Sequence, residues 1–111
     1  MGNDYIFAGL GASSCILVHE LKRKGLLNNK KILVIDPSTK IANDKTYCFW
    51  SKDTEEITQD FSAMASHCWS KISTDSHLPQ EMGDLKYYHI NSLELYNATK
   101  RILTQHGAIF L

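Results

Sequence analysis

The chain has 111 residues, a length that fits one domain or part of one. Hydrophobic residues make up 43% of it, which supports a folded core and excludes a disordered chain. Twelve Lys and Arg residues balance twelve Asp and Glu residues, so the composition does not indicate a nucleic-acid-binding protein.

The three cysteines, Cys15, Cys48 and Cys68, leave one unpaired in any disulfide scheme, and they lack the spacing of metal ligands. We therefore expect reduced thiols, a cytoplasmic protein and no metal site. No apolar run approaches the roughly 20 residues that span a bilayer.

The first part of the chain predicts a strand, a glycine turn, a helix and a second strand. Residues 4–8 are apolar after Asp4 and end at Gly9, and residues 12–24 show a helical period that Gly25 ends. The helix is expected to bury Ala12, Ile16, Leu17 and Leu21. Residues 31–36 contain an unbroken apolar run between Lys31 and Asp36, typical of a central parallel strand buried on both faces.

The middle of the chain has a weaker pattern. We expect an extended segment at 46–50, a short helix within 53–66 that places Ile57, Phe61 and Met64 on one side, and a strand at 69–74. Residues 77–84 contain Pro79 and Gly83 and predict a turn, and residues 86–90 predict a strand.

A second clear helix is predicted over residues 92–106. Ser92 suits its N-cap and Gly107 its end, and its apolar face comprises Leu95, Tyr96, Thr99, Ile102 and Leu103. Residues 108–111 then resemble the start of a buried strand, from which we expect a truncated chain.

The glycine turn predicts a dinucleotide site. Gly9 and Gly11 take the first two places of the G-x-G-x-x-G pattern, and Ser14 takes the third. The N–H groups at the helix N-terminus can bind a pyrophosphate, and Asp36, after the second strand, can accept hydrogen bonds from a ribose. We assign cofactor contacts to Gly9, Leu10, Gly11, Ala12, Ser14 and Asp36. The pattern does not separate FAD from NAD, and the alternative is a plain turn with two glycines.

The octapeptide Asn43–Trp50, with the sequence NDKTYCFW, resembles the NDRTWCFW signature of lycopene cyclases. Six of its eight places match, and Lys45 and Tyr47 depart from it. The segments Gly9–Gly11 and Ile35–Pro37 are similar to the opening turn and second strand end of that family. Weaker likenesses fall at Trp69, at Tyr88–Ile90 and at Leu95–Tyr96.

The resemblance implies an α/β, Rossmann-like FAD-binding fold with a parallel sheet, spanning residues 1–111 as the N-terminal part of a flavoprotein. It implies an isomerase of carotenoid biosynthesis that cyclises lycopene end groups to β-ionone rings by acid-initiated, non-redox carbocation chemistry. Reduced FAD is the implied cofactor in preference to NAD(P), lycopene or a related carotenoid is the partner, and the membrane contact of the intact enzyme is peripheral.

We assign no catalytic residue, because the family's catalytic acid lies downstream of this chain. The acidic residues Asp44, Asp53, Glu55 and Glu56 are not placed in that role. We expect weak flavin affinity and no cyclase activity from these 111 residues alone.

Two other functions stay open, an FAD-dependent oxidoreductase or hydroxylase and a free-standing dinucleotide-binding module. For residues 43–50 two roles also stay open: turn and core, or a site beside the flavin or a polyene channel.

Overall fold

The computed structural model of the chain describes residues 2–38, 45–52, 54–73 and 78–111. The fold is mixed α/β and divides into two compact units. The parallel-sheet unit comprises Met1–Asn43 and Leu93–Leu111, and the antiparallel-sheet unit comprises Asp44–Ser92. Asn43, Asp44 and Asp53 lie outside the described residues.

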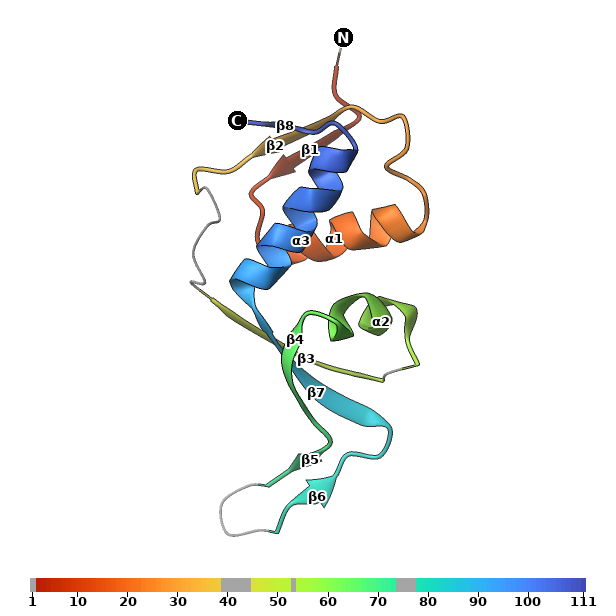
Figure 1. Cartoon of the computed structure of the whole chain (residues 1–111), viewed down its shortest axis with the longest axis vertical. Coiled ribbons are helices and arrows are strands. Elements are labelled where there is room, and N and C mark those ends of the chain that lie inside the picture. The colour runs from red at the N-terminus through yellow and green to blue at the C-terminus, as the bar shows by residue number, and fades with distance from the viewer. Residues whose placement is uncertain (1, 39–44, 53, 74–77) are drawn as a thin grey trace. The chain divides into compact units, whose positions relative to one another are not determined.

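A parallel three-stranded sheet forms the centre of the first unit (Figure 1). Its elements are β1 (Tyr5–Ala8), α1 (Ala12–Arg23), β2 (Ile32–Ile35), α3 (Ser92–Gln105) and β8 (Ile109–Phe110). The strand order is β1-β2-β8, and both neighbouring pairs are parallel. The predicted strand–helix–strand unit and the parallel sheet are therefore confirmed, with strands one or two residues shorter at their ends than predicted.

Only one face of this sheet is buried. Phe7, Ile32 and Val34 lie on the face that α1 and α3 cover (Figure 1). Ile6 and Ile109 point to the other side and are each 59% exposed. The prediction that β2 is buried on both faces is wrong, because the described elements of this unit supply helices to one face alone.

The buried side of α1 also differs from the predicted one. Ile16 and Leu17 are about half exposed, whereas Cys15, Val18 and His19 are buried. His19 Nε2 lies 3.2 Å from Thr99 Oγ1 of α3, and this hydroxyl donates to the Leu95 carbonyl at 2.8 Å. The inward side of α1 therefore carries a polar contact to α3 beside the fully buried Cys15 and Val18, and apolar periodicity alone does not reveal this side.

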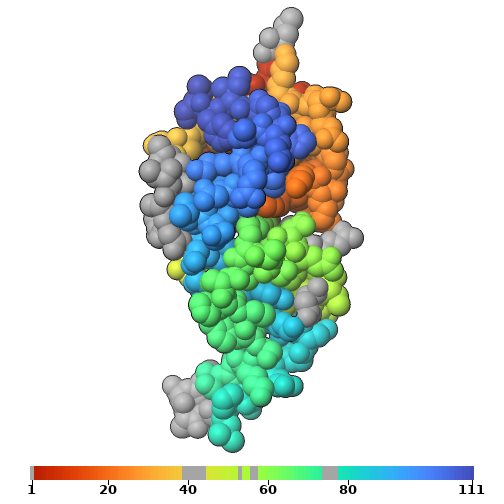
Figure 2. Space-filling view, viewed as in Figure 1, coloured from red at the N-terminus to blue at the C-terminus, as the bar shows by residue number. Residues whose placement is uncertain are grey.

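The predicted apolar face of α3 is confirmed. All five of its residues are buried, namely Leu95, Tyr96, Thr99, Ile102 and Leu103. Gly107 adopts φ +74° and its N–H donates to the Thr104 carbonyl, which ends the helix as expected. In the space-filling view the C-terminal residues, in dark blue, pack against N-terminal residues drawn in red and orange (Figure 2).

The second unit contains a three-stranded antiparallel sheet of order β3-β7-β4 and a two-stranded pair, β5-β6. Its elements are β3 (Thr46–Lys52), α2 (Glu56–Ser62), β4 (Ala65–Trp69), β5 (Lys71–Ile72), β6 (Gln80–Glu81) and β7 (Leu85–Asn91). The expected extended segment, short helix and later strand are present. The strand predicted at 69–74 is wrong in its limits, because β4 ends at Trp69 and β5 covers only Lys71–Ile72. The turn predicted at 77–84 includes β6.

The octapeptide supplies β3 in the part that is described. Lys45 and Ser92 form a reciprocal pair, in which Lys45 N–H donates to Ser92 Oγ at 3.0 Å and Ser92 N–H donates to the Lys45 carbonyl at 3.3 Å. Ser92 is the first residue of α3, and its hydroxyl oxygen also accepts a hydrogen bond from the residue before β3. Within the described ranges, no helix is both long and apolar enough to cross a membrane.

Candidate functional site

The candidate site lies where β1 turns into α1. Gly9 adopts φ +95°, a conformation that side chains other than glycine rarely take, and its N–H donates to the Ile35 carbonyl at 2.7 Å. Leu10 is buried and anchors the turn. The turn is thus tied to the end of β2 by its own backbone.

Gly11 is the N-cap of α1. It is extended, with φ −80° and ψ −171°, and no side chain caps the helix there. The first turn of α1 carries no acidic residue, so the positive end of the helix dipole is not neutralised from within the helix. A Cβ added at Gly11 would meet no atom within 4 Å, which leaves open space for a ligand beside the backbone.

Asp36 follows β2 and binds the turn directly. Its Oδ2 accepts the Leu10 N–H at 2.6 Å, and its Oδ1 accepts the Ser38 N–H at 2.7 Å. The carboxylate therefore joins the turn at Leu10 to a residue that lies 26 positions further along the chain. Each oxygen of an ionised carboxylate can accept two hydrogen bonds, which is the chemistry that binding of a ribose hydroxyl requires.

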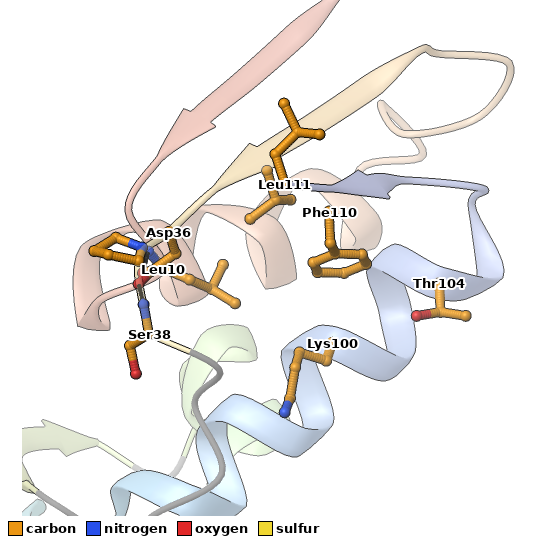
Figure 3. Close-up of a pocket in the computed structure, with 9 residues that line it drawn as sticks. Leu10, Asp36, Ser38, Lys100, Thr104, Phe110 and Leu111 are labelled. Atoms are coloured by element: carbon orange, nitrogen blue, oxygen red, sulfur yellow. Dashed lines mark hydrogen bonds between the residues drawn. The ribbon is translucent and has the colours of Figure 1, made fainter.

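A cavity of about 550 Å³ opens beside this turn (Figure 3). Of the described residues, those lining it are Leu10, Val34, Asp36, Pro37, Ser38, Lys100, Thr104, Phe110 and Leu111. Its wall is mostly apolar, with the acid that follows β2 and a cation from α3. This combination of an apolar wall and a few polar groups is typical of small-molecule sites.

The structure brings together part of the predicted set. Leu10 and Asp36 line the cavity, whereas Gly9, Gly11, Ala12 and Ser14 are placed in the adjoining turn and first turn of α1. Ser14 is half-buried in α1.

Sequence reasoning missed Ser38, Lys100, Thr104 and Phe110 as lining residues. Lys100 and Thr104 are four apart and so lie on one side of α3, and Phe110 ends β8 next to β2. The convergence of parallel strand ends was the signal that could have indicated Phe110.

Metal and disulfide chemistry find no support in the described parts of the chain. No group of three or more His, Cys, Asp or Glu residues there is arranged to hold a metal ion. Cys15, Cys48 and Cys68 form no disulfide bond in the part of the chain that the structure describes.

Comparison with known proteins gives one family. The family model described as lycopene cyclase protein matches residues 4–111. No curated protein matches the chain.

Proposed function

The chain belongs to the lycopene cyclase family, and on that premise we propose that it forms the FAD-binding site of a cyclase that acts on carotenoid end groups. The family supports the carotenoid as substrate of the intact enzyme. The flavin and the chemistry are our proposal, which rests on the geometry of the β1–α1 turn and the adjoining cavity.

The observation that carries this proposal is the bond from Leu10 N–H to Asp36 Oδ2, 2.6 Å long, at the edge of the cavity. It places the acid that would bind a ribose beside the turn that would bind a pyrophosphate. In dinucleotide-binding α/β folds these two groups occupy neighbouring places on the ligand.

The strand order supports the same function. Along the chain, β1, β2 and β8 are the first, second and third strands of this sheet. Read across the sheet from β8, their order is 3-2-1, which is one half of the 3-2-1-4-5-6 order of doubly wound dinucleotide-binding sheets. Ligands of such sheets bind outside the carboxyl ends of the strands. Asp36, Ser38 and Leu111 line the cavity and follow β2 and β8, so the cavity lies at that edge.

The residues present fit a pyrophosphate. The open space at Gly11 and the absence of an acid in the first turn of α1 suit a negatively charged group at the helix N-terminus. Leu10, Val34 and Phe110 would provide apolar contact to the adenine, and Asp36 would accept bonds from the ribose hydroxyls.

Reduced FAD, when bound, would supply an electron-rich isoalloxazine for the non-redox cyclisation. The residues of this chain bind and orient the adenosine and pyrophosphate. We place no catalytic acid among them, and we propose that these 111 residues alone bind flavin weakly and do not cyclise lycopene.

Asp36 also favours FAD over NADP. A carboxylate that binds the ribose hydroxyls repels a 2′-phosphate. We therefore expect ADP to bind more tightly than 2′,5′-ADP. The Asp36→Asn variant should show a smaller difference in affinity between these two nucleotides.

The direct test is equilibrium binding of FAD and of ADP to the chain, with Gly11→Ala as the variant. The added methyl group would occupy the space proposed for the phosphate, so we expect affinity to fall at least about tenfold, equivalent to about 1.4 kcal/mol. Gly2→Ala makes the same chemical change at an exposed position away from the turn and should leave affinity unchanged.

Circular dichroism controls for folding, since Gly11→Ala should retain the helical signal. The proposal fails if the wild-type chain binds neither FAD nor ADP at millimolar concentration, or if Gly11→Ala binds as well as Gly2→Ala.

A further inference from the structure

The antiparallel-sheet unit carries a row of rings on one face of its sheet. Trp50, Tyr87 and Trp69 lie opposite one another on β3, β7 and β4. The Trp50 and Tyr87 rings are 4.6 Å apart, and the Tyr87 and Trp69 rings are 6.1 Å apart. His67 stacks on Trp69 at 5.4 Å and meets His89 edge-on at 5.7 Å. We call these five residues the aromatic row.

The aromatic row is not the core of this unit. Trp50 and Trp69 are 45% and 43% exposed. The opposite face of the sheet forms the core, where Phe49 stacks on Tyr88 at 5.2 Å and meets Phe61 of α2 edge-on at 6.4 Å. Because side chains alternate along a strand, Phe49 and Trp50 point to opposite faces. Exposed tryptophans on this face lower the solubility of the protein. Their presence there suggests that they contact a ligand.

The chemistry of the aromatic row indicates which kind of ligand it can bind. Its rings present flat, polarisable faces with negative electrostatic potential. Lys52 projects from the same side of β3 and lies 3.6 Å from Asp84, so a carboxylate accompanies this cation at the end of the sheet. A surface of this kind complements a flat hydrocarbon that carries no charge or develops positive charge. It complements an anionic ligand poorly.

We propose that the aromatic row holds the acyclic end group of the carotenoid substrate, with Tyr87 as its central contact. This inference rests on the proposed function, because the family supplies the carotenoid as substrate of the intact enzyme. The row crosses three strands, which corresponds to about 10 Å and accommodates one end group.

Tyr87 suits the central position for a geometric reason. It lies between the two tryptophans in register, so its ring completes a continuous surface across the sheet. The octapeptide contributes Trp50 to this surface. Of the described octapeptide residues, 45–50, none belongs to the lining of the cavity beside Asp36, so a role in substrate contact accounts for a segment that the nucleotide site does not use.

The two tryptophans of the chain, Trp50 and Trp69, both belong to the row and report on it directly. The experiment titrates the 111-residue chain with pseudoionone, a short acyclic polyene ketone that carries the uncyclised end group. Tryptophan emission is followed and corrected with N-acetyltryptophanamide. We expect saturable quenching.

The variants separate ring contact from other effects. Tyr87→Leu keeps both tryptophans and should weaken binding roughly tenfold, as expected for loss of an aromatic contact and its buried area. Tyr87→Phe keeps the ring and should stay within about threefold of wild type. Leu78→Ser removes an exposed apolar side chain of the same unit outside the row, and should change nothing.

Several outcomes would overturn the inference. These are quenching that does not saturate, equal losses in Tyr87→Phe and Tyr87→Leu, or quenching that Tyr87→Leu leaves intact. Concentration-dependent dimerisation that Tyr87→Leu abolishes would assign the row to a second copy of the chain. Loss of FAD binding in Tyr87→Leu would assign it to the flavin.

The same titration is repeated with Asp36→Ala. This variant should lose ADP binding and keep pseudoionone binding, so failure of the nucleotide site and failure of the aromatic row give different results.

Discussion

The Leu10 amide donates to Asp36 Oδ2 at 2.6 Å, joining the turn after β1 to the end of β2. The Gly9 amide donates to the Ile35 carbonyl beside it at 2.7 Å. Two hydrogen bonds therefore fix the turn to the neighbouring strand. Asp36 is thus both a candidate ribose ligand and a residue that positions the turn.

We expect Asp36→Ala to loosen the turn locally. The variant leaves the Leu10 and Ser38 amides without their carboxylate acceptor. Hydrogen exchange at these two amides should accelerate by about fivefold to tenfold, the effect of a bond worth about 1 kcal/mol. The Val34 amide, in the middle of β2, serves as the internal control. Unchanged exchange at Leu10 would show that the Asp36 bond does not hold the turn.

Gly9→Ala should destabilise the turn. At φ +95° a side chain is strained, although no neighbouring atom blocks it, and the cost is about 1–2 kcal/mol. The thermal unfolding midpoint should fall, while Gly2→Ala leaves it unchanged. A Gly9→Ala chain as stable as the Gly2→Ala chain would contradict the left-handed turn.

Thr99→Val should destabilise the contact between α1 and α3. Valine has nearly the same shape but removes the oxygen that faces His19 Nε2, which leaves buried polar atoms without this partner. We expect a loss of about 1–3 kcal/mol in the free energy of unfolding, measured by denaturant titration. Thr99→Ser retains the hydroxyl and should lose about 1 kcal/mol, from the deleted methyl group. Equal stability of the valine variant and wild type would contradict this contact.

Glu20 should make stability depend on pH in acid. The hydrogen bond from Arg23, helped by the charges of Arg23 and Lys24, lowers the pKa of Glu20 below its ordinary value of 4.5. A carboxylate with a lowered pKa stabilises the fold above the unfolded-state pKa, and this contribution is lost as the pH falls through the folded-state pKa.

The measurement is the difference in thermal midpoint between wild type and Glu20→Gln. The midpoint of wild type should exceed that of the variant at pH 7, and this difference should shrink from about pH 4.5 downward. Glu81→Gln alters an exposed carboxylate on β6 and is the matched control. A difference that persists unchanged at pH 2.5 would refute this role for Glu20.

Turn glycines and the period of apolar residues predicted the turns and the helix face to which those residues belong. The glycines at 9, 11 and 107 mark changes of backbone direction, and the period of Leu95, Tyr96, Thr99, Ile102 and Leu103 identified the inner face of α3. Asp36 was expected at the nucleotide site from its place after a strand, and it lies in the lining of the cavity.

Features that depend on distant partners were not predicted. The inner side of α1 includes His19, which contacts Thr99, eighty residues away. The limits of β4 depend on pairing with β7, including the irregular register between Ala65 and His67. Lys100 lines the cavity only because α3 lies beside the end of β2. Single-sequence periodicity contains none of these relationships.

The central claim is that the β1–α1 turn and Asp36 bind the adenosine and pyrophosphate of FAD. The most direct measurement is an ADP titration of the 15N-labelled chain, followed by the shifts of its backbone amide signals. We predict saturable shifts concentrated at Gly9–Ser14 and at Ser38, and none for the amides of β5 and β6. Absence of saturable shifts at the turn, or shifts confined to other segments, would contradict the claim.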